Sequence, residues 1–91
     1  MMERKHITVI GRVQGVYFRA YTEKKAIELL LNGYVRNLSN GNVFIDVEGP
    51  KDDINTFIQW CHTGSPLSKV RTLEIEDMPE LAGYSEFIIK R

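Results

Sequence analysis

The stretch that decides this fold runs from Gly11 to Arg19 and reads Gly11-Arg12-Val13-Gln14-Gly15-Val16-Tyr17-Phe18-Arg19. It separates a short β-branched run ending at Ile10 from the first helical pattern, which begins at Phe18. Two glycines four positions apart let the backbone turn tightly and bring several N–H groups together at the start of the helix. We predict a turn from a buried strand into a helix, with room for an anion.

Arg19 leaves two interpretations of this turn open. It lies at the N-terminal end of the predicted helix, where the positive end of the macrodipole disfavours a cation. A bound phosphate or carboxylate would remove that conflict. The alternative is that Arg19 points into solvent and that the two glycines only permit a tight connection.

Periodicity predicts the elements that follow the turn. Apolar and charged residues separate onto two sides of a helix from Phe18 to Asn32, with Phe18, Ala26, Leu29 and Leu30 on the apolar side. Asn32-Gly33 is a typical C-terminal stop. An extended segment, residues 34–38, then leads through Asn40-Gly41 into an alternating strand, residues 43–48, which predicts a β-hairpin.

The second half repeats the order of helix and strand. A helix follows Pro50 and presents Ile54, Phe57, Ile58 and Cys61 as one buried stripe. Residues 62–67 form a loop by their turn residues. Strands are predicted over 70–76, with Leu73 and Ile75 on one face, and over 84–90, with Phe87 and Ile89 directed inward.

This order of elements is that of an α+β, ferredoxin-like split βαβ fold: βαββαβ plus a short extra terminal strand. In that arrangement two helices cover one face of an antiparallel sheet, and the first and third strands are central neighbours. At 91 residues, we expect one domain spanning residues 1–91.

The composition and the charge distribution narrow the range of possible functions. Hydrophobic residues make up 43% and charged residues 26%, which is typical of a globular protein, and the net charge is zero. That balance gives no support for general binding to nucleic acid or to a membrane surface. Residues 1–36 carry a net charge of +4 and residues 37–91 a net charge of −4. The candidate anion loop lies in the positive half, which favours a small charged substrate over a polymer.

Several chemistries are disfavoured by the residues present. No Gly-Lys-Ser/Thr follows a glycine loop, so no nucleotide site is indicated. His6 and His62 are too far apart in sequence to suggest a metal site by themselves. Cys61 is the only cysteine and belongs to an apolar stripe, so it is expected to be a core residue in a reducing compartment. The short apolar run before Gly11 is no signal peptide or membrane span, and a cytoplasmic location is expected.

Asn37 is the remaining polar residue that needs an explanation, because asparagine is unfavourable within an extended segment. It could cap the approach to the hairpin or lie at a sheet edge. Alternatively, its amide could hold a water molecule in line with a phosphorus atom. Phosphoryl transfer requires mainly positioning and charge stabilisation, so an arginine, backbone donors and one such amide could be enough.

Two segments resemble the signatures of the acylphosphatase family. Residues 11–19 match G-x-V-Q-G-V-x-F-R, and residues 33–43 match G-[WY]-V-x-N-x-x-[DN]-G-x-V. The similarity extends over nearly the whole chain, while residues 64–70 differ from the more common Gly-Pro-rich form of that loop. The resemblance implies a small cytosolic hydrolase that splits acyl phosphates into carboxylate and phosphate without metal or cofactor.

The resemblance also implies residue roles. Arg19 would bind the phosphoryl group together with the backbone N–H groups of Gln14, Gly15, Val16, Tyr17 and Phe18. Asn37 would orient the attacking water. The expected partner is the small acyl phosphate alone, with no nucleic acid and no membrane, and the expected state is a monomer.

Two other functions remain open from the sequence. One is a non-catalytic anion-binding or regulatory module, because one fold supports many functions. The other is RNA binding through the sheet, which neutral charge and scattered aromatic residues disfavour.

Overall fold

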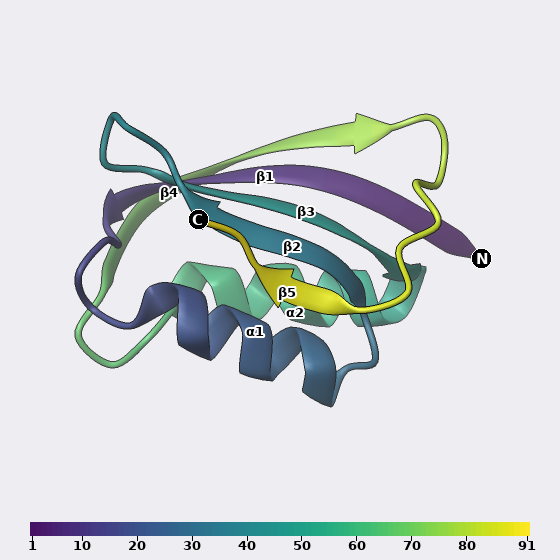
Figure 1. The fold of residues 1–91 in the computed structure, drawn as a ribbon, viewed down its shortest axis with the longest axis horizontal. Coiled ribbons are helices and arrows are strands. Elements are labelled where there is room, and N and C mark those ends of the chain that lie inside the picture. Colours follow the sequence, from purple (N-terminus) through teal and green to yellow (C-terminus); the bar gives the residue numbers. More distant parts are fainter.

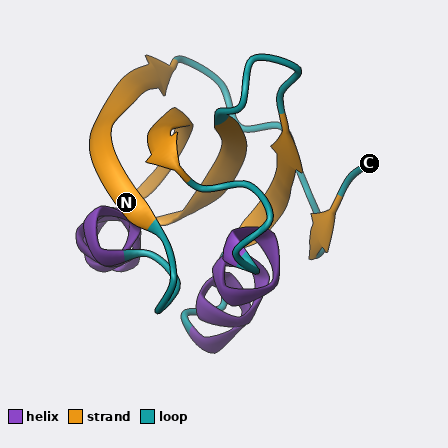
Figure 2. Cartoon of the chain, turned by 90° about the vertical axis from the view of Figure 1, so that its left-hand side faces the viewer, coloured by secondary structure: helices purple, strands orange, loops and turns teal.

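Five strands form one sheet in the order β4-β1-β3-β2-β5, and both helices lie on the same face of it (Figure 1). The computed structural model describes residues 1–91. Seen end-on in Figure 2, the sheet curls over the two helices and leaves its opposite face open. The elements are β1 (Met2–Arg12), α1 (Phe18–Glu28), β2 (Asn32–Asn37), β3 (Val43–Pro50), α2 (Lys51–Thr63), β4 (Lys69–Met78) and β5 (Phe87–Ile89).

The strand pairing confirms the split βαβ prediction and corrects one detail of it. β1 is antiparallel to both β3 and β4, and β2 is antiparallel to β3, so the first and third strands are central neighbours. The extra strand β5 is parallel to β2, which makes the sheet mixed rather than wholly antiparallel. After β4 the chain crosses to the far edge at the end of the sheet where β4 finishes. β5 therefore runs opposite to β4 and in the same direction as β2.

The core lies between the helices and the inward face of the sheet. Fifteen buried apolar residues form one cluster, including Ile7 and Val9 from β1. The predicted stripe on α2 is confirmed, because Ile54, Phe57 and Cys61 are fully buried and Ile58 is packed against them. Burying an aliphatic or aromatic side chain of this size contributes roughly 1.5–3 kcal/mol. The core therefore packs α2 against β4 as well as against the two central strands, β1 and β3.

The first helix ends at Glu28, and the prediction that it extends to Asn32 is wrong. Leu30 has a φ of 59° and is 84% exposed, whereas Leu31 is buried. The N–H of Leu31 donates to the carbonyl of Ala26, and that of Leu30 donates to Ile27. These two bonds form a Schellman motif with leucine in the left-handed position that glycine usually occupies. Burial of Leu31 explains why the chain leaves the helix early.

The last two strands also differ from their predicted forms. β5 covers only residues 87–89. The backbone N–H groups of residues 82–84 do not pair with a strand, because they donate to the Glu48 carboxylate. β4 is longer than predicted, and Ile75 is 45% exposed there, while Leu73 packs against the core. β4 is an edge strand, which leaves part of its inner face without cover.

Candidate active site

The loop between β1 and α1 borders a cleft of about 380 Å³. Arg19 enters it from the first turn of α1, and Asn37 enters it from the last position of β2. Of the seven predicted site residues, five line this cleft together: Gly15, Tyr17, Phe18, Arg19 and Asn37. The remaining lining residues are Val13, Ala20, Ile89 and Arg91.

Gln14 and Val16, the other two predicted residues, do not line the cleft with their side chains. The Gln14 amide Nε2 donates to the carbonyl oxygens of Leu38 at 2.7 Å and of Asn42 at 2.8 Å. The carbonyl of Val16 accepts a bond of 2.8 Å from the Ser65 hydroxyl. The loop is thus tied on one side to the β2–β3 hairpin and on the other to the segment before β4.

Ser65 is a residue that the sequence analysis missed. It belongs to the 64–70 segment, which departs from the more common form of the loop, and it is almost fully buried. A buried hydroxyl needs a hydrogen-bond partner, and the Val16 carbonyl supplies one. Nothing in the local sequence pairs these two residues, because 49 positions separate them.

The backbone of the loop presents a run of free donors. None of the N–H groups from Gln14 to Phe18 donates to an acceptor within the protein. Gly15 and Tyr17 have φ values of 74° and 62°, so left-handed residues alternate along the loop. Alternation of this kind turns successive N–H groups toward a common concave side and favours anion binding.

The side chains around these donors supply positive charge and one unpaired acceptor. Arg19 makes no ion pair with any carboxylate, and no acidic residue lines the cleft. Asn37 Oδ1 is buried and has no hydrogen-bond partner in the protein. A buried unpaired acceptor costs about 1–3 kcal/mol. The arrangement is therefore built to receive an anion together with a hydrogen-bond donor.

Cys61 takes no part in this site. It is fully buried under the sheet in α2, as predicted for a core residue. Burial raises the pKa of its thiol well above the usual range, which suppresses the thiolate. Nucleophilic chemistry from Cys61 is not supported.

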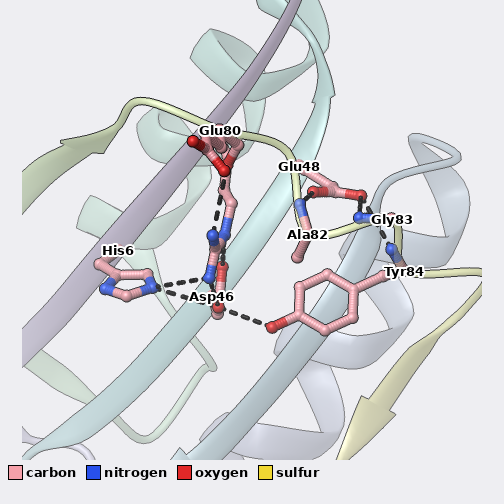
Figure 3. A network of polar contacts seen from close by, with 8 residues as sticks. His6, Asp46, Glu48, Glu80, Ala82, Gly83 and Tyr84 are labelled. Carbon is pink, nitrogen blue, oxygen red and sulfur yellow. Dashed lines mark hydrogen bonds and ion pairs between the residues drawn. The ribbon is translucent and has the colours of Figure 1, made fainter.

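A second polar cluster lies on the open face of the sheet (Figure 3). Arg4 donates Nε to Asp46 Oδ1 at 2.9 Å and Nη2 to Oδ2 at 2.7 Å. The Tyr84 hydroxyl donates to Asp46 Oδ2 at 2.7 Å, and His6 Nε2 lies 3.1 Å from the same oxygen. Beside this cluster, Glu48 accepts the backbone N–H groups of residues 82–84. These contacts fasten the segment between β4 and β5 across the sheet.

The contacts in this cluster shift the pKa values of Asp46 and Tyr84. Burial of Asp46 opposes ionisation, but hydrogen bonds from Arg4 and Tyr84, with the nearby charges, outweigh it and lower the pKa of the carboxyl. Burial and the bond to Asp46 raise the pKa of Tyr84 to about 12. None of these residues lines the Arg19 cleft, so we assign the cluster a structural role.

The fold offers neither a cluster of metal ligands nor a membrane-spanning helix. No group of three or more His, Cys, Asp and Glu side chains is arranged to hold a metal ion. Neither helix is long and apolar enough to cross a membrane. The expectation of a metal-free reaction stays a prediction.

Several known proteins that are similar to this chain are acylphosphatases. The profile of the acylphosphatase family matches residues 5–89. An acylphosphatase from Methylococcus capsulatus is 41% identical over 90 residues, covering 99% of this chain and 98% of that protein. One from Natronomonas pharaonis is 45% identical over 89 residues, covering 97% and 95%.

The similarity extends to a solved structure. The crystal structure of acylphosphatase from Bacillus subtilis superposes with a TM-score of 0.96 at 36% sequence identity, and the match covers 100% of both chains. The family profile and the structural match both include residues 11–19 and 33–43, the two motif segments that contribute Arg19 and Asn37. The chain therefore belongs to the acylphosphatase family and is a hydrolase of that class.

Proposed function

We propose that the Arg19 cleft hydrolyses the carboxyl-phosphate anhydride of acyl phosphates, and that residues 1–91 form one domain carrying this site. Arg19 and the backbone N–H groups of Gln14 to Phe18 bind the phosphoryl group, and Asn37 orients the attacking water. One observation carries the proposal: five unpaired N–H groups, a guanidinium without a carboxylate partner and an unpaired amide oxygen belong to the same loop and cleft.

Binding of the phosphoryl group follows from these donors. A guanidinium is planar and permanently charged, so it can bond two phosphate oxygens at once. The N–H groups at the start of α1 point their positive dipoles toward the same anion. The bound phosphate also removes the unfavourable placement of Arg19 at a helix N-terminus. Donors that are already in place favour the additional charge of the transition state without further reorganisation.

The role of Asn37 follows from its unpaired oxygen. One hydrogen of a water molecule can bond to Oδ1, which directs a lone pair of the water toward the phosphorus. As the new P–O bond forms, the bond between phosphorus and the acyl oxygen breaks, and its electron pair leaves on the carboxylate. A carboxylate is a weak base, so no general acid is required. The proton of the water passes to a phosphoryl oxygen.

The names of the relatives agree with this substrate class. The proteins from Methylococcus capsulatus and Natronomonas pharaonis are both acylphosphatases. We propose by extension that the substrate is a small acyl phosphate and that the enzyme acts as a cytoplasmic monomer without cofactor, metal, nucleic acid or membrane.

Hydrolysis of benzoyl phosphate by the purified protein in the presence of a chelator tests the proposal. Arg19→Ala should lower kcat/KM by about 10²-fold or more, as loss of a preorganised donor does elsewhere. Asn37→Ala should lower kcat/KM by about 10²-fold or more because the attacking water is no longer positioned. Arg36→Ala is the matched control for the arginine, because Arg36 lies over the Phe44 ring on the open face. Asn55→Ala, on the exposed side of α2, is the control for the amide.

The outcomes separate the alternatives. Unchanged turnover in both site variants would refute the assigned roles. Binding of inorganic phosphate without any turnover would assign a non-catalytic anion site to the same loop.

A further inference from the structure

Arg91 lies beside Asn37 although 54 positions separate them in sequence. β5 pairs with β2 so that Ile89 is opposite Val35. The N–H of Lys90 donates to the Val35 carbonyl at 2.9 Å, which continues the pairing beyond the last residue of β5. Continuing this register brings Arg91 alongside Asn37, and both residues line the cleft.

Alternation along β5 separates Arg91 from its neighbouring cation. Phe87 is buried and Ile89 packs against the core, so both face the helices. Lys90 faces the other way, with its Nζ 4.2 Å from the centre of the Tyr34 ring. Because successive strand residues point to opposite faces, Arg91 returns to the cleft side. Lys90 and Arg91 are therefore neighbouring cations on opposite faces of the sheet, and Lys90 is a control for Arg91.

Arg91 gives the cleft a second guanidinium group besides that of Arg19. Neither Arg19 nor Arg91 makes an ion pair, whereas Arg4, Lys5 and Lys25 each pair with a carboxylate. Arg19 and five backbone donors already serve the phosphoryl group in the proposed function. A second guanidinium without a partner is then available to another part of the substrate.

The size of the cleft allows such a contact. Its volume of about 380 Å³ lies within the range of small-molecule sites, about 300–1,000 Å³. In the proposed function the phosphoryl group binds at the end of the cleft near the loop, which leaves the space toward β5 for the acyl group. Ile89 offers an apolar surface to that acyl group, and Arg91 offers a charge.

We propose that Arg91 is a specificity residue, and that this enzyme favours acyl phosphates whose acyl group carries a second anionic group, a carboxylate or a phosphate. The proposal rests on the proposed function, because it concerns the same cleft and the same reaction. A guanidinium binds either anion through two parallel N–H donors. The contact is made at a partly open site, so we expect it to raise kcat/KM by about 5- to 10-fold.

A matched pair of substrates tests this assignment: benzoyl phosphate and its derivatives that carry a carboxylate at ring position 3 or 4. The quantity of interest is the ratio of kcat/KM for the carboxylated substrate to that for benzoyl phosphate. The wild-type enzyme should favour one carboxylated substrate by about 5- to 10-fold. Raising the salt concentration should reduce that ratio, because the contact is between charges.

Variants then locate the effect. Arg91→Gln should bring the ratio close to one, Arg91→Lys should keep part of it, and Lys90→Gln should leave it at the wild-type value. A wild-type ratio near one, or an unchanged ratio in Arg91→Gln, would overturn the assignment of Arg91 while hydrolysis itself still supported the proposed function. Failure of the wild-type enzyme to hydrolyse any of the substrates would instead refute the proposed function.

Discussion

Glu48 accepts a hydrogen bond of 2.9 Å from the backbone N–H of Tyr84, and its carboxylate also accepts those of Ala82 and Gly83. These three bonds join the end of the central strand β3 to the segment that crosses from β4 to β5 (Figure 3). β5 in turn places Ile89 and Arg91 beside the cleft. A carboxylate on the open face of the sheet therefore fixes one wall of the site on the other face.

Replacing Glu48 should cost stability. In Glu48→Ala the three N–H groups lose a charged acceptor, and we expect the free energy of unfolding to fall by about 3 kcal/mol. Urea denaturation measures the change. Glu74→Ala, an exposed carboxylate on β4, should alter stability by less than about 0.5 kcal/mol. Equal effects of the two substitutions would contradict the role assigned to Glu48.

Asp46 should make stability depend on pH in the acid range. Its folded-state pKa lies below the unfolded value of about 3.9, because bonds from Arg4 and Tyr84 outweigh burial. The folded protein then binds fewer protons than the unfolded chain. This contribution is complete above the unfolded pKa and is lost as pH falls through the folded pKa.

Urea denaturation at a series of pH values from neutral to strongly acidic measures that loss. Asp46→Asn should be less stable than the wild type by about 2 kcal/mol at neutral pH. The difference between the two proteins should shrink as the pH drops below about 4. A difference that stays constant across this range would show that Asp46 does not carry the acid dependence.

Leu30 is a position at which stability can be gained. Its φ of 59° is unfavourable for leucine, and its side chain is 84% exposed, so little packing is lost on substitution. Leu30→Gly should raise the free energy of unfolding by about 1 kcal/mol, because glycine tolerates the left-handed conformation. Leu30→Ala keeps the conformational cost and should give no comparable gain. Thermal denaturation of the two variants distinguishes strain relief from loss of an exposed apolar side chain.

The sequence predicts features that depend on local periodicity. Three features each specify an element within one short segment of sequence: the alternation in β3, the Asn-Gly turn and the stripe through Phe57. The end of α1 at Glu28, with Leu30 in the left-handed conformation, could not be predicted, because it depends on burial of Leu31 against the core. Local propensity favours Asn32-Gly33 as a stop, and tertiary packing overrides it.

The residues of the candidate site also fall into two groups, those with a local sequence signal and those without one. Arg19 and Asn37 lie within two short motifs, so the sequence alone marks both as candidates, and both line one cleft in the structure. Ser65 and Arg91 carry no local signal, since each reaches the site through contacts between distant segments. Arg91 in particular depends on the parallel pairing of β5 with β2, and the expected antiparallel sheet did not include that pairing.

Gln14 should control activity through the shape of the loop. Its amide holds the loop against two carbonyl oxygens of the β2–β3 hairpin, which also carries Asn37. Gln14→Ala should lower kcat by about 10-fold or more, because a loop displaced by 1 Å misaligns the N–H donors. Gln59→Ala, in α2 and outside the cleft lining, is the matched control. Wild-type kcat in Gln14→Ala would show that the loop keeps its shape without these bonds.

Phosphate binding should stabilise the folded protein through Arg19. Unpaired N–H groups and an unpaired guanidinium occupy the start of α1, and an anion there satisfies both. At a phosphate concentration ten times the Kd, linkage gives about 1.4 kcal/mol, which raises Tm by roughly 5 °C or more for a domain of this size. Arg19→Ala should lose most of this shift, while Arg36→Ala should keep it. Since salt itself changes Tm, chloride at equal ionic strength is the reference. An equal Tm in saturating phosphate and in chloride would contradict both the anion site and the roles proposed for the loop.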